Sequence, residues 1–213
     1  YEEDQNRHPL ISNLISACEK EGGRVLPVTR SLLVKVSNKD NPQTVIGAYA
    51  QFATSFSNII EEKIRCWVAL DRIRDPGNLG TIIRTIDAVA ADGIILIDNC
   101  TDPFSIESVR ASMGAIFSLK LSYCNTSEFL AFRKKFSGNI IGTSLKSNID
   151  YKTADWKSPC VILMGNEQSG LSNELSNACD QLITMPMRGR SDSLNLAVAT
   201  GISLYEFLRH EAN

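Results

Sequence analysis

The sequence has no long hydrophobic run. None approaches the ~20 apolar residues that cross a bilayer, and no signal-peptide pattern is present. Its six cysteines are scattered, without the CxxC or Cys/His spacing of a zinc site. Unpaired thiols without a disulfide framework are typical of a reducing compartment. We therefore expect a cytoplasmic protein with no membrane anchor and no metal.

An excess of basic residues is also lacking. The 22 Lys and Arg are balanced by 24 Asp and Glu, which gives a net charge of −2. Nucleic-acid-binding proteins are often basic, so the total charge does not support RNA binding, although local patches matter more than the total. The 213 residues suffice for one good core or two small domains.

The glycine turn of a dinucleotide-binding fold, GxGxxG after the first strand, is missing. That place reads DRIRDPGNLG, with one glycine too few and a proline in the turn. Without the glycine turn, Asp98 at the end of the second strand is expected to be a strand-end polar residue and not a ribose-binding acid. The glycines are instead concentrated late in the chain.

What the chain does have, from Cys66 onward, is regular alternation of strands and helices. Apolar runs such as IILI and VILM indicate strands covered on both faces. The alternation predicts an α/β fold, with a parallel sheet, helices on both faces and ligands beyond the carboxyl ends of the strands. We expect strands at 66–70, 94–98, 117–122, 139–143, 160–164 and 182–185, and helices at 79–91, 105–114, 126–137, 171–179 and 194–210.

Two strand ends carry glycine, asparagine and charged residues. In LDRIRDPGNLGTIIRTID, Asn78 and Gly80 lie at a helix start and Arg84 follows one turn later. In VILMGNEQSGL, a strand leads into Gly165-Asn166-Glu167, and Gly170 closes a tight loop. Glycine at both ends of that loop allows positive φ and close approach of the backbone to a ligand.

A third strand end has the same character. It reads LITMPMRGRSDSLNLAVATGISL, in which the strand ends at Met185-Pro186-Met187 and a polar loop follows. Ser193 and Asn195 then open a long apolar helix, because their side chains can accept hydrogen bonds from the first-turn N–H groups. Such a strand–loop–helix unit presents backbone donors to a ligand.

In order and spacing, these three motifs resemble the SpoU (TrmH-like) branch of the SPOUT RNA methyltransferases, from about Trp67 to the C-terminus. The resemblance implies a C-terminal trefoil knot, S-adenosyl-L-methionine as cofactor, and a homodimer that packs through the last helix. It implies methylation of a ribose 2′-hydroxyl in ribosomal RNA. A transfer RNA target and a catalytically silent RNA-binding relative remain the alternatives.

The resemblance also implies a cofactor pocket built from three segments. Gly165 leaves room for the ligand, and Met185 and Leu194 sandwich the adenine, although plain core packing is the alternative for these two side chains. The cofactor-binding residues expected are Thr143, Ser144, Leu145, Gly165, Asn166, Gly170, Met185, Met187 and Leu194.

Five polar residues are the expected catalytic set: Asn78, Arg84, Glu167, Ser193 and Asn195. Neighbouring apolar residues form the core side of the Arg84 helix, so Arg84 is expected to point toward the strand ends. It acts as a general base, which the permanent positive charge of an arginine side chain makes demanding, or stabilises a phosphate or alkoxide. Glu167 accepts the proton, braces its loop or bonds Asn78 across the site. Asn78 itself is expected to cap the first helix.

Basic residues and the last helix indicate partners. A buried monomeric core helix is the alternative to a dimer for LAVATGISLYEFLRH, which is apolar on most of its circumference. The residues expected to contact RNA phosphates are Arg72, Arg74, Arg110, Arg188 and Arg190.

The N-terminal quarter reads as a small αβαβ piece. Helices are expected at 10–21 and 29–36, and strands at 25–26 and 45–49. The piece resembles the second half of the ribosomal-protein-L30e-like substrate-binding domain of this family, so we expect a truncated N-terminus; an unrelated extension is the alternative. With the domain boundary in the polar bridge 51–63, residues 1–58 form this domain and its linker, and residues 59–213 form the catalytic domain.

Overall fold

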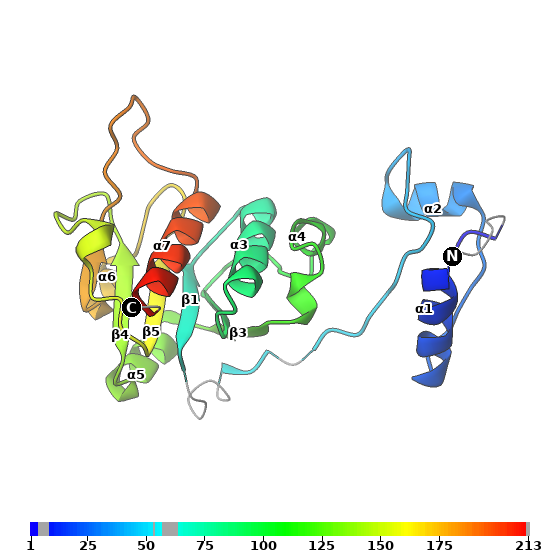
Figure 1. The fold of residues 1–213 in the computed structure, drawn as a ribbon, viewed down its shortest axis with the longest axis horizontal. Helices are drawn as coiled ribbons and strands as arrows, with labels where there is room; N and C mark the ends of the chain where they lie inside the picture. The colour runs from blue at the N-terminus through cyan, green and yellow to red at the C-terminus, as the bar shows by residue number, and fades with distance from the viewer. Residues whose placement is uncertain (4–8, 53, 57–63, 212–213) are drawn as a thin grey trace. The chain divides into compact units, whose positions relative to one another are not determined.

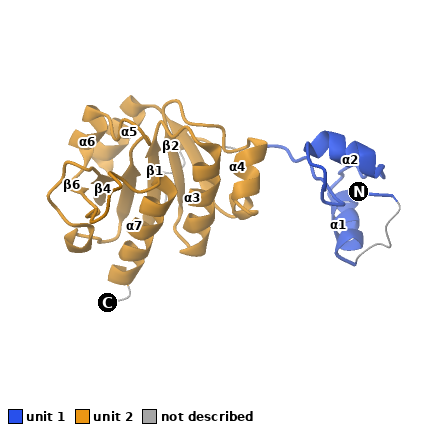
Figure 2. Cartoon of the chain, turned by 90° about the horizontal axis from the view of Figure 1, so that it is seen from above, with its two compact units in different colours: residues 1–51 blue, residues 52–213 orange. Residues whose placement is uncertain are grey.

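The computed structural model describes residues 1–3, 9–52, 54–56 and 64–211. The chain divides into two compact units, Tyr1–Gln51 and Phe52–Asn213, which are coloured separately in Figure 2. No helix in these residue ranges is long and apolar enough to cross a membrane.

The first unit contains helices α1 (Pro9–Lys20) and α2 (Arg30–Ser37), as predicted. The two strands predicted at 25–26 and 45–49 are wrong, because neither segment has regular structure. Tyr49, at the end of the second segment, is 73% exposed. An apolar run becomes a strand only when a neighbouring strand completes its hydrogen bonds. Here the described residues provide one isolated bridge, between Glu2 and Val28.

The second unit is built on a six-stranded parallel sheet, with strand order β3-β2-β1-β5-β4-β6. All six predicted strands are confirmed, with ends that shift by up to three residues. The strands are β1 (Cys66–Asp71), β2 (Gly93–Ile97), β3 (Lys120–Cys124), β4 (Asn139–Thr143), β5 (Cys160–Met164) and β6 (Gln181–Ile183).

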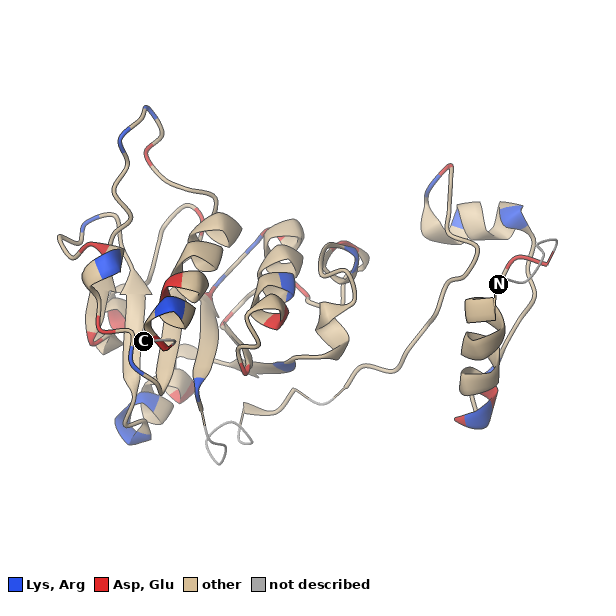
Figure 3. Ribbon diagram, in the orientation of Figure 1, with Lys and Arg blue, Asp and Glu red and all other residues tan. Residues whose placement is uncertain are grey.

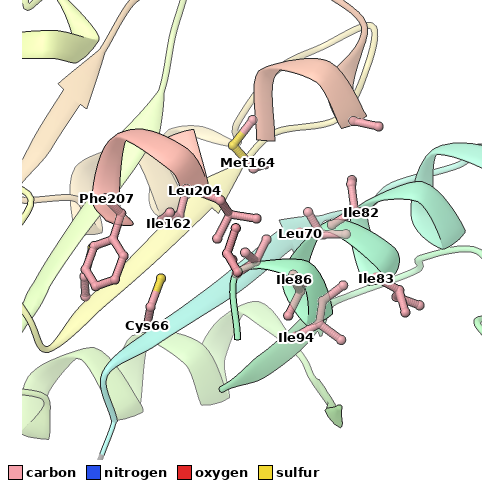
Figure 4. Close-up of a cluster of buried hydrophobic side chains, with 14 of the residues drawn as sticks. Cys66, Leu70, Ile82, Ile83, Ile86, Ile94, Ile162, Met164, Leu204 and Phe207 are labelled. Atoms are coloured by element: carbon pink, nitrogen blue, oxygen red, sulfur yellow. The ribbon is translucent and has the colours of Figure 1, made fainter. Parts of the chain in front are cut away.

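Helices cover both faces of this sheet, as the apolar strands require (Figure 1). Helices α3, α4 and α7 contribute side chains to the core on one face, and α5 and α6 to the core on the other. The close-up in Figure 4 shows how Leu70 of β1, Ile86 of α3 and Leu204 of α7 meet in the first core. The helices are α3 (Pro76–Ala88), α4 (Ile106–Ala111), α5 (Thr126–Lys135), α6 (Asn173–Ala178) and α7 (Leu196–Glu211), with 3₁₀ turns η2 (Ala115–Phe117) and η3 (Tyr151–Thr153).

The loop after β4 holds the end of β6 from two sides. The Ser144 N–H donates to the Ile183 carbonyl (2.8 Å). The next residue, Thr184, donates to the Ile149 carbonyl (2.8 Å) and accepts from the Tyr151 N–H (3.0 Å). Because successive residues of a strand turn their backbone groups to alternate edges, residues 144–151 bond both edges of residues 183–184.

Candidate functional site

Three polar side chains from three strand-end segments form one hydrogen-bonded chain. The Asn195 amide Nδ2 donates to Asn78 Oδ1 at 2.9 Å, and Asn78 Nδ2 lies 3.4 Å from Glu167 Oε1. Of the three roles considered for Glu167, the structure bears out the bond to Asn78, and it adds Asn195 to this contact. These residues follow β1, β5 and β6, so the carboxyl edge of the sheet is where the three motifs meet.

Asn195 also begins the last helix. Its Oδ1 accepts from the backbone N–H groups of Ala197 (2.9 Å) and Val198 (3.3 Å), so it caps α7 at Leu196. The predicted helix-starting role of Asn195 is confirmed. Ser193 lies outside the helix and is exposed.

Asn78 does not cap α3, contrary to the prediction. Asp75 is the cap, and its Oδ1 accepts from the Asn78 backbone N–H at 2.6 Å. Pro76 occupies the first helical position, where its fixed φ suits the helix and its missing N–H costs no hydrogen bond. The Asp-Pro pair was the sequence signal for this start. Because Asp75 supplies the cap, the Asn78 side chain can hydrogen-bond with Glu167 and Asn195 instead.

The loop after β5 is a tight turn closed on itself. Asn166 and Gly170 exchange two backbone hydrogen bonds (3.1 and 2.9 Å), and Asn166 Oδ1 accepts from the backbone N–H groups of Gln168 and Ser169. Gly170 has the expected positive φ of 68°. Gly165 does not, and its requirement is space: an added Cβ would lie 2.3 Å from the backbone of Gly170. Asn166 and Gly165 therefore shape the loop that carries Glu167.

Glu167 lies beside a shallow hollow of about 420 Å³, lined by Arg72, Arg74, Asp75 and residues 166–169. Its carboxylate is exposed and is approached by the backbone N–H groups of Arg74 and Asp75, each at 3.4 Å. An exposed carboxylate that accepts from several donors can receive a proton or hold a hydroxyl. No group of three or more His, Cys, Asp or Glu in the described ranges could hold a metal ion.

An ion pair that sequence reasoning missed lies at the end of β1. Asp71 is 1% exposed, and the Arg72 guanidinium donates to both of its carboxylate oxygens, at 2.7 and 3.0 Å. The hydrogen bond to Asp71 raises the pKa of the Arg72 guanidinium. Arg72 was expected to contact RNA phosphate, but its Nε and Nη2 groups already donate to Asp71. The available signal was an acid directly following an otherwise apolar strand.

Arg84 is not brought into the hydrogen-bonded chain. Its neighbours Ile82, Ile83 and Ile86 are buried as predicted, and Arg84 itself is exposed. It follows Gly80 by one helical turn, and an added Cβ at Gly80 would lie 2.4 Å from the Ser108 carbonyl oxygen of α4. Arg84 thus lies on the α4 side of α3, about 9 Å along the helix axis beyond Asn78. Within the residues that the structure describes, its guanidinium makes no hydrogen bond or ion pair.

The segments expected to hold the cofactor converge at the same edge of the sheet. Thr143 Oγ1 lies 3.8 Å from Met164 Sδ, which joins the ends of β4 and β5, and the Ser144 bond to Ile183 joins the ends of β4 and β6. Leu145 and Leu194 are exposed there, so core packing does not explain Leu194. Met185 and Met187 are half-buried.

Basic side chains gather on the long loop between β6 and α7. Arg188 and Arg190 are exposed on it, and the acidic Asp192 follows, as the coloured segment before α7 in Figure 3 shows. Arg74, on the loop after β1, is also exposed. The carboxyl edge of the sheet therefore carries several exposed cations although the whole chain is slightly acidic.

Sequence comparison connects this arrangement with known proteins. The model of the SpoU rRNA Methylase family matches residues 65–205. A 23S rRNA (uridine(2479)-2′-O)-methyltransferase of Streptomyces viridochromogenes is 33% identical over 185 residues, which is 84% of this chain and 64% of that protein. The chain thus spans less than two thirds of that relative. The 23S rRNA (guanosine-2′-O-)-methyltransferase RlmB of Ralstonia nicotianae is 28% identical over 218 residues, covering 100% of this chain and 87% of its own length.

The fold is also similar to solved structures. A crystal structure of an AdoMet-bound rRNA methyltransferase from Sinorhizobium meliloti superposes with a TM-score of 0.90 at 45% sequence identity. The match covers 95% of this chain and 78% of that one.

Proposed function

The chain belongs to the SpoU rRNA Methylase family, and from this premise we propose that it is an S-adenosyl-L-methionine-dependent methyltransferase acting on a ribose 2′-hydroxyl of ribosomal RNA. The observation that carries the proposal is the chain of Asn195, Asn78 and Glu167, which joins the three motif segments at one edge of the sheet. Relatives named as 23S rRNA 2′-O-methyltransferases support ribosomal over transfer RNA.

The residues present fit the cofactor. Residues 143–145, 164–170 and 183–195 meet where strand ends leave apolar side chains exposed beside polar backbone. An adenine needs apolar surface on its faces and a few placed polar groups at its edges. In this proposal Leu194 and Met185 supply the apolar surface, and the 165–170 turn supplies backbone close to the ligand.

The chemistry requires alignment and proton removal. Bound S-adenosyl-L-methionine supplies an electrophilic methyl group on its sulfonium. Glu167 accepts the hydroxyl proton, while Asn78 holds that carboxylate in place; a placed base contributes about 10²–10⁴-fold. Arg84, whose guanidinium has no hydrogen-bond or ion-pair partner among the described residues, binds the neighbouring phosphate or the developing alkoxide. Alignment of the reactants supplies a further ~7–11 kcal/mol.

RNA is held by the exposed cations and by the N-terminal unit. Arg74, Arg188 and Arg190 surround the site and are suited to phosphate oxygens. The first unit is proposed as a partial substrate-binding domain; similarity to the Ralstonia enzyme, which covers 100% of this chain, supports this assignment.

The protein is proposed to act as a homodimer through α7. Val198, Tyr205 and Leu208 are exposed on that helix and recur at intervals of seven and three residues, which places them on one face. Monomers seldom leave such a face uncovered. A two-fold interface would cover the same patch on both chains.

The C-terminal segment is proposed to thread through the 144–151 loop as a trefoil knot. The support is that this loop bonds both edges of residues 183–184, so the chain that follows β6 passes between β4 and residues 149–151. A threaded segment would hold the motif at 185–195 against the ends of β4 and β5.

Three measurements test the function. Calorimetry with S-adenosylhomocysteine should show binding, and a cocrystal should place the adenosine against residues 143–145, 164–170 and 183–195; adenosine against Gly77 and Gly80 would refute the pocket. Mapping of 2′-O-methyl sites in RNA from a deletion strain should show one ribosomal site lost. A protein that binds RNA while all sites persist would be a catalytically silent relative.

A further inference from the structure

We infer that Asp71 and Arg72 are the positioning residues that place Glu167 for the reaction, an inference that rests on the function proposed above. Asp71 is 1% exposed, so it does not touch substrate. Arg72 directs its guanidinium back onto Asp71, so two of its donor nitrogens are already used. The pair acts through the loop that carries Glu167.

The backbone at Arg72 has a strained conformation, and its side chain is paired with the preceding residue. Arg72 has φ of +52°, a left-handed conformation that a bulky residue rarely adopts. Its Nε and Nη2 bind the two oxygens of Asp71 side by side. The left-handed turn ends β1, and residues 71–72 lie beside the loop after β5 because β1 and β5 are neighbouring strands.

Both ends of the Glu167 loop are anchored on these two residues. At its start, Asn166 Nδ2 donates to the Arg72 carbonyl oxygen at 2.8 Å. At its end, the Ser172 backbone N–H donates to Asp71 Oδ2 at 3.0 Å. Glu167 lies between the two anchors.

The direct contacts of Glu167 are weaker than its anchors. Its bonds from Arg74 N, Asp75 N and Asn78 Nδ2 are all 3.4 Å, at the long limit for a hydrogen bond. The anchors at 2.8 and 3.0 Å therefore fix the loop from which the carboxylate projects, and the longer contacts only orient its side chain. A catalytic group must be placed closely, since a displacement of about 1 Å can cost about 10²-fold in rate.

The chain offers a matched control at the opposite edge of the sheet. Asp180 accepts from the Arg133 guanidinium (2.5 Å) and from the Ile140 backbone N–H (2.8 Å). Like Asp71, it joins an arginine to the backbone of another segment, but it lies at the amino ends of β4 and β6. Asp71→Asn therefore changes a carboxylate to an amide beside the site, and Asp180→Asn makes the same chemical change far from it.

Hydrogen exchange of the folded protein tests the anchoring. In Asp71→Asn, the amides of Gln168, Ser169 and Ser172 should exchange about tenfold faster or more, because the loop opens locally. In Asp180→Asn they should exchange as in the unchanged protein. Arg72→Lys leaves the buried carboxylate with a cation but removes the two-pronged bond, so its effect should be intermediate.

Turnover tests the consequence for catalysis. In Asp71→Asn, kcat should fall about 10²-fold while KM for RNA changes less than about threefold. Asp180→Asn should keep kcat, and Arg72→Lys should recover part of it relative to Arg72→Ala. Unchanged exchange in the loop, or equal kcat for the two aspartate variants, would overturn the inference. If the unchanged protein methylates no RNA, the proposed function fails, and the exchange comparison still decides the anchoring.

Discussion

The side-chain amide of Asn195 donates a 2.9 Å hydrogen bond to the side-chain oxygen of Asn78, 117 positions earlier in the chain. The orientation of both amides follows from their other partners. Asn195 Oδ1 faces the Ala197 N–H of α7, so its NH₂ group must face Asn78, whose own NH₂ group then faces Glu167. The N-terminus of α7 is thus connected to the carboxylate through two oriented amides.

Asn195→Asp separates the capping role of this residue from its role in the site. A carboxylate still caps α7 and suits the positive end of the helix, but it cannot donate to Asn78. We expect an unfolding free energy within about 0.5 kcal/mol of the unchanged protein and a methyl-transfer rate lowered by about 10²-fold. Asn125→Asp is the control, because Asn125 caps α5 and has no partner at the site. Equal turnover of the two variants would contradict the role of the amide.

Arg84→Ala should abolish methyl transfer and leave cofactor affinity unchanged, because Arg84 lies outside the proposed cofactor segments. Its exposed side chain makes the change in stability smaller than about 0.5 kcal/mol. Calorimetry with S-adenosylhomocysteine and a turnover assay measure the two effects, with Lys134→Ala on α5 as an exposed-cation control. Arg84→Lys retains turnover if a point charge suffices, and loses it if a two-pronged fork is needed. Near-normal turnover of Arg84→Ala would make this residue structural.

A charge on the exposed face of α7 should separate the proposed dimer. Leu204→Glu and Tyr205→Glu appear equivalent from the sequence, but Leu204 is 0% exposed in the chain's own core and Tyr205 is 56% exposed. Tyr205→Glu should therefore keep the fold and weaken association, and it should weaken cofactor binding because the interface would order the 187–195 loop that leads into α7. Leu204→Glu should instead unfold the chain. Sedimentation at micromolar concentration measures association. A monomer of 23.5 kDa that still binds cofactor would refute the dimer and its coupling to the site.

Alkaline pH should destabilise the fold through its buried thiols. Burial raises the pKa of Cys124, Cys160 and Cys179 from 9.0 to about 12. Since the folded pKa lies above the unfolded one, the stabilisation is complete below pH 9 and is lost as pH rises toward 12. Each thiol contributes a decline of at most about 1.4 kcal/mol per pH unit in that window. Urea unfolding at pH 8, 10 and 11 measures it, and Cys160→Ala should flatten the decline.

The sequence was sufficient for the local elements of the second unit. Runs such as IILI are too apolar to lie anywhere but inside a covered sheet, so the six strands and their intervening helices follow from periodicity alone. Local sequence patterns gave wrong predictions where the structure of a segment depends on a neighbouring segment. The apolar segments at 25–26 and 45–49 lack a strand to pair with, and the apolar circumference of α7 does not reveal that Leu204 faces inward and Tyr205 outward.

The sequence by itself also determined that Asn78, Glu167 and Asn195 would lie close together, because they follow strands whose carboxyl ends must share one edge. Only the tertiary structure decided how they are used. Asp75 takes the cap of α3, which frees Asn78 to join Asn195 and Glu167. Asp71, which resembles the end of a buried strand in the sequence, anchors a loop 101 positions away. Such contacts depend on the approach of distant backbone segments, which no local pattern encodes.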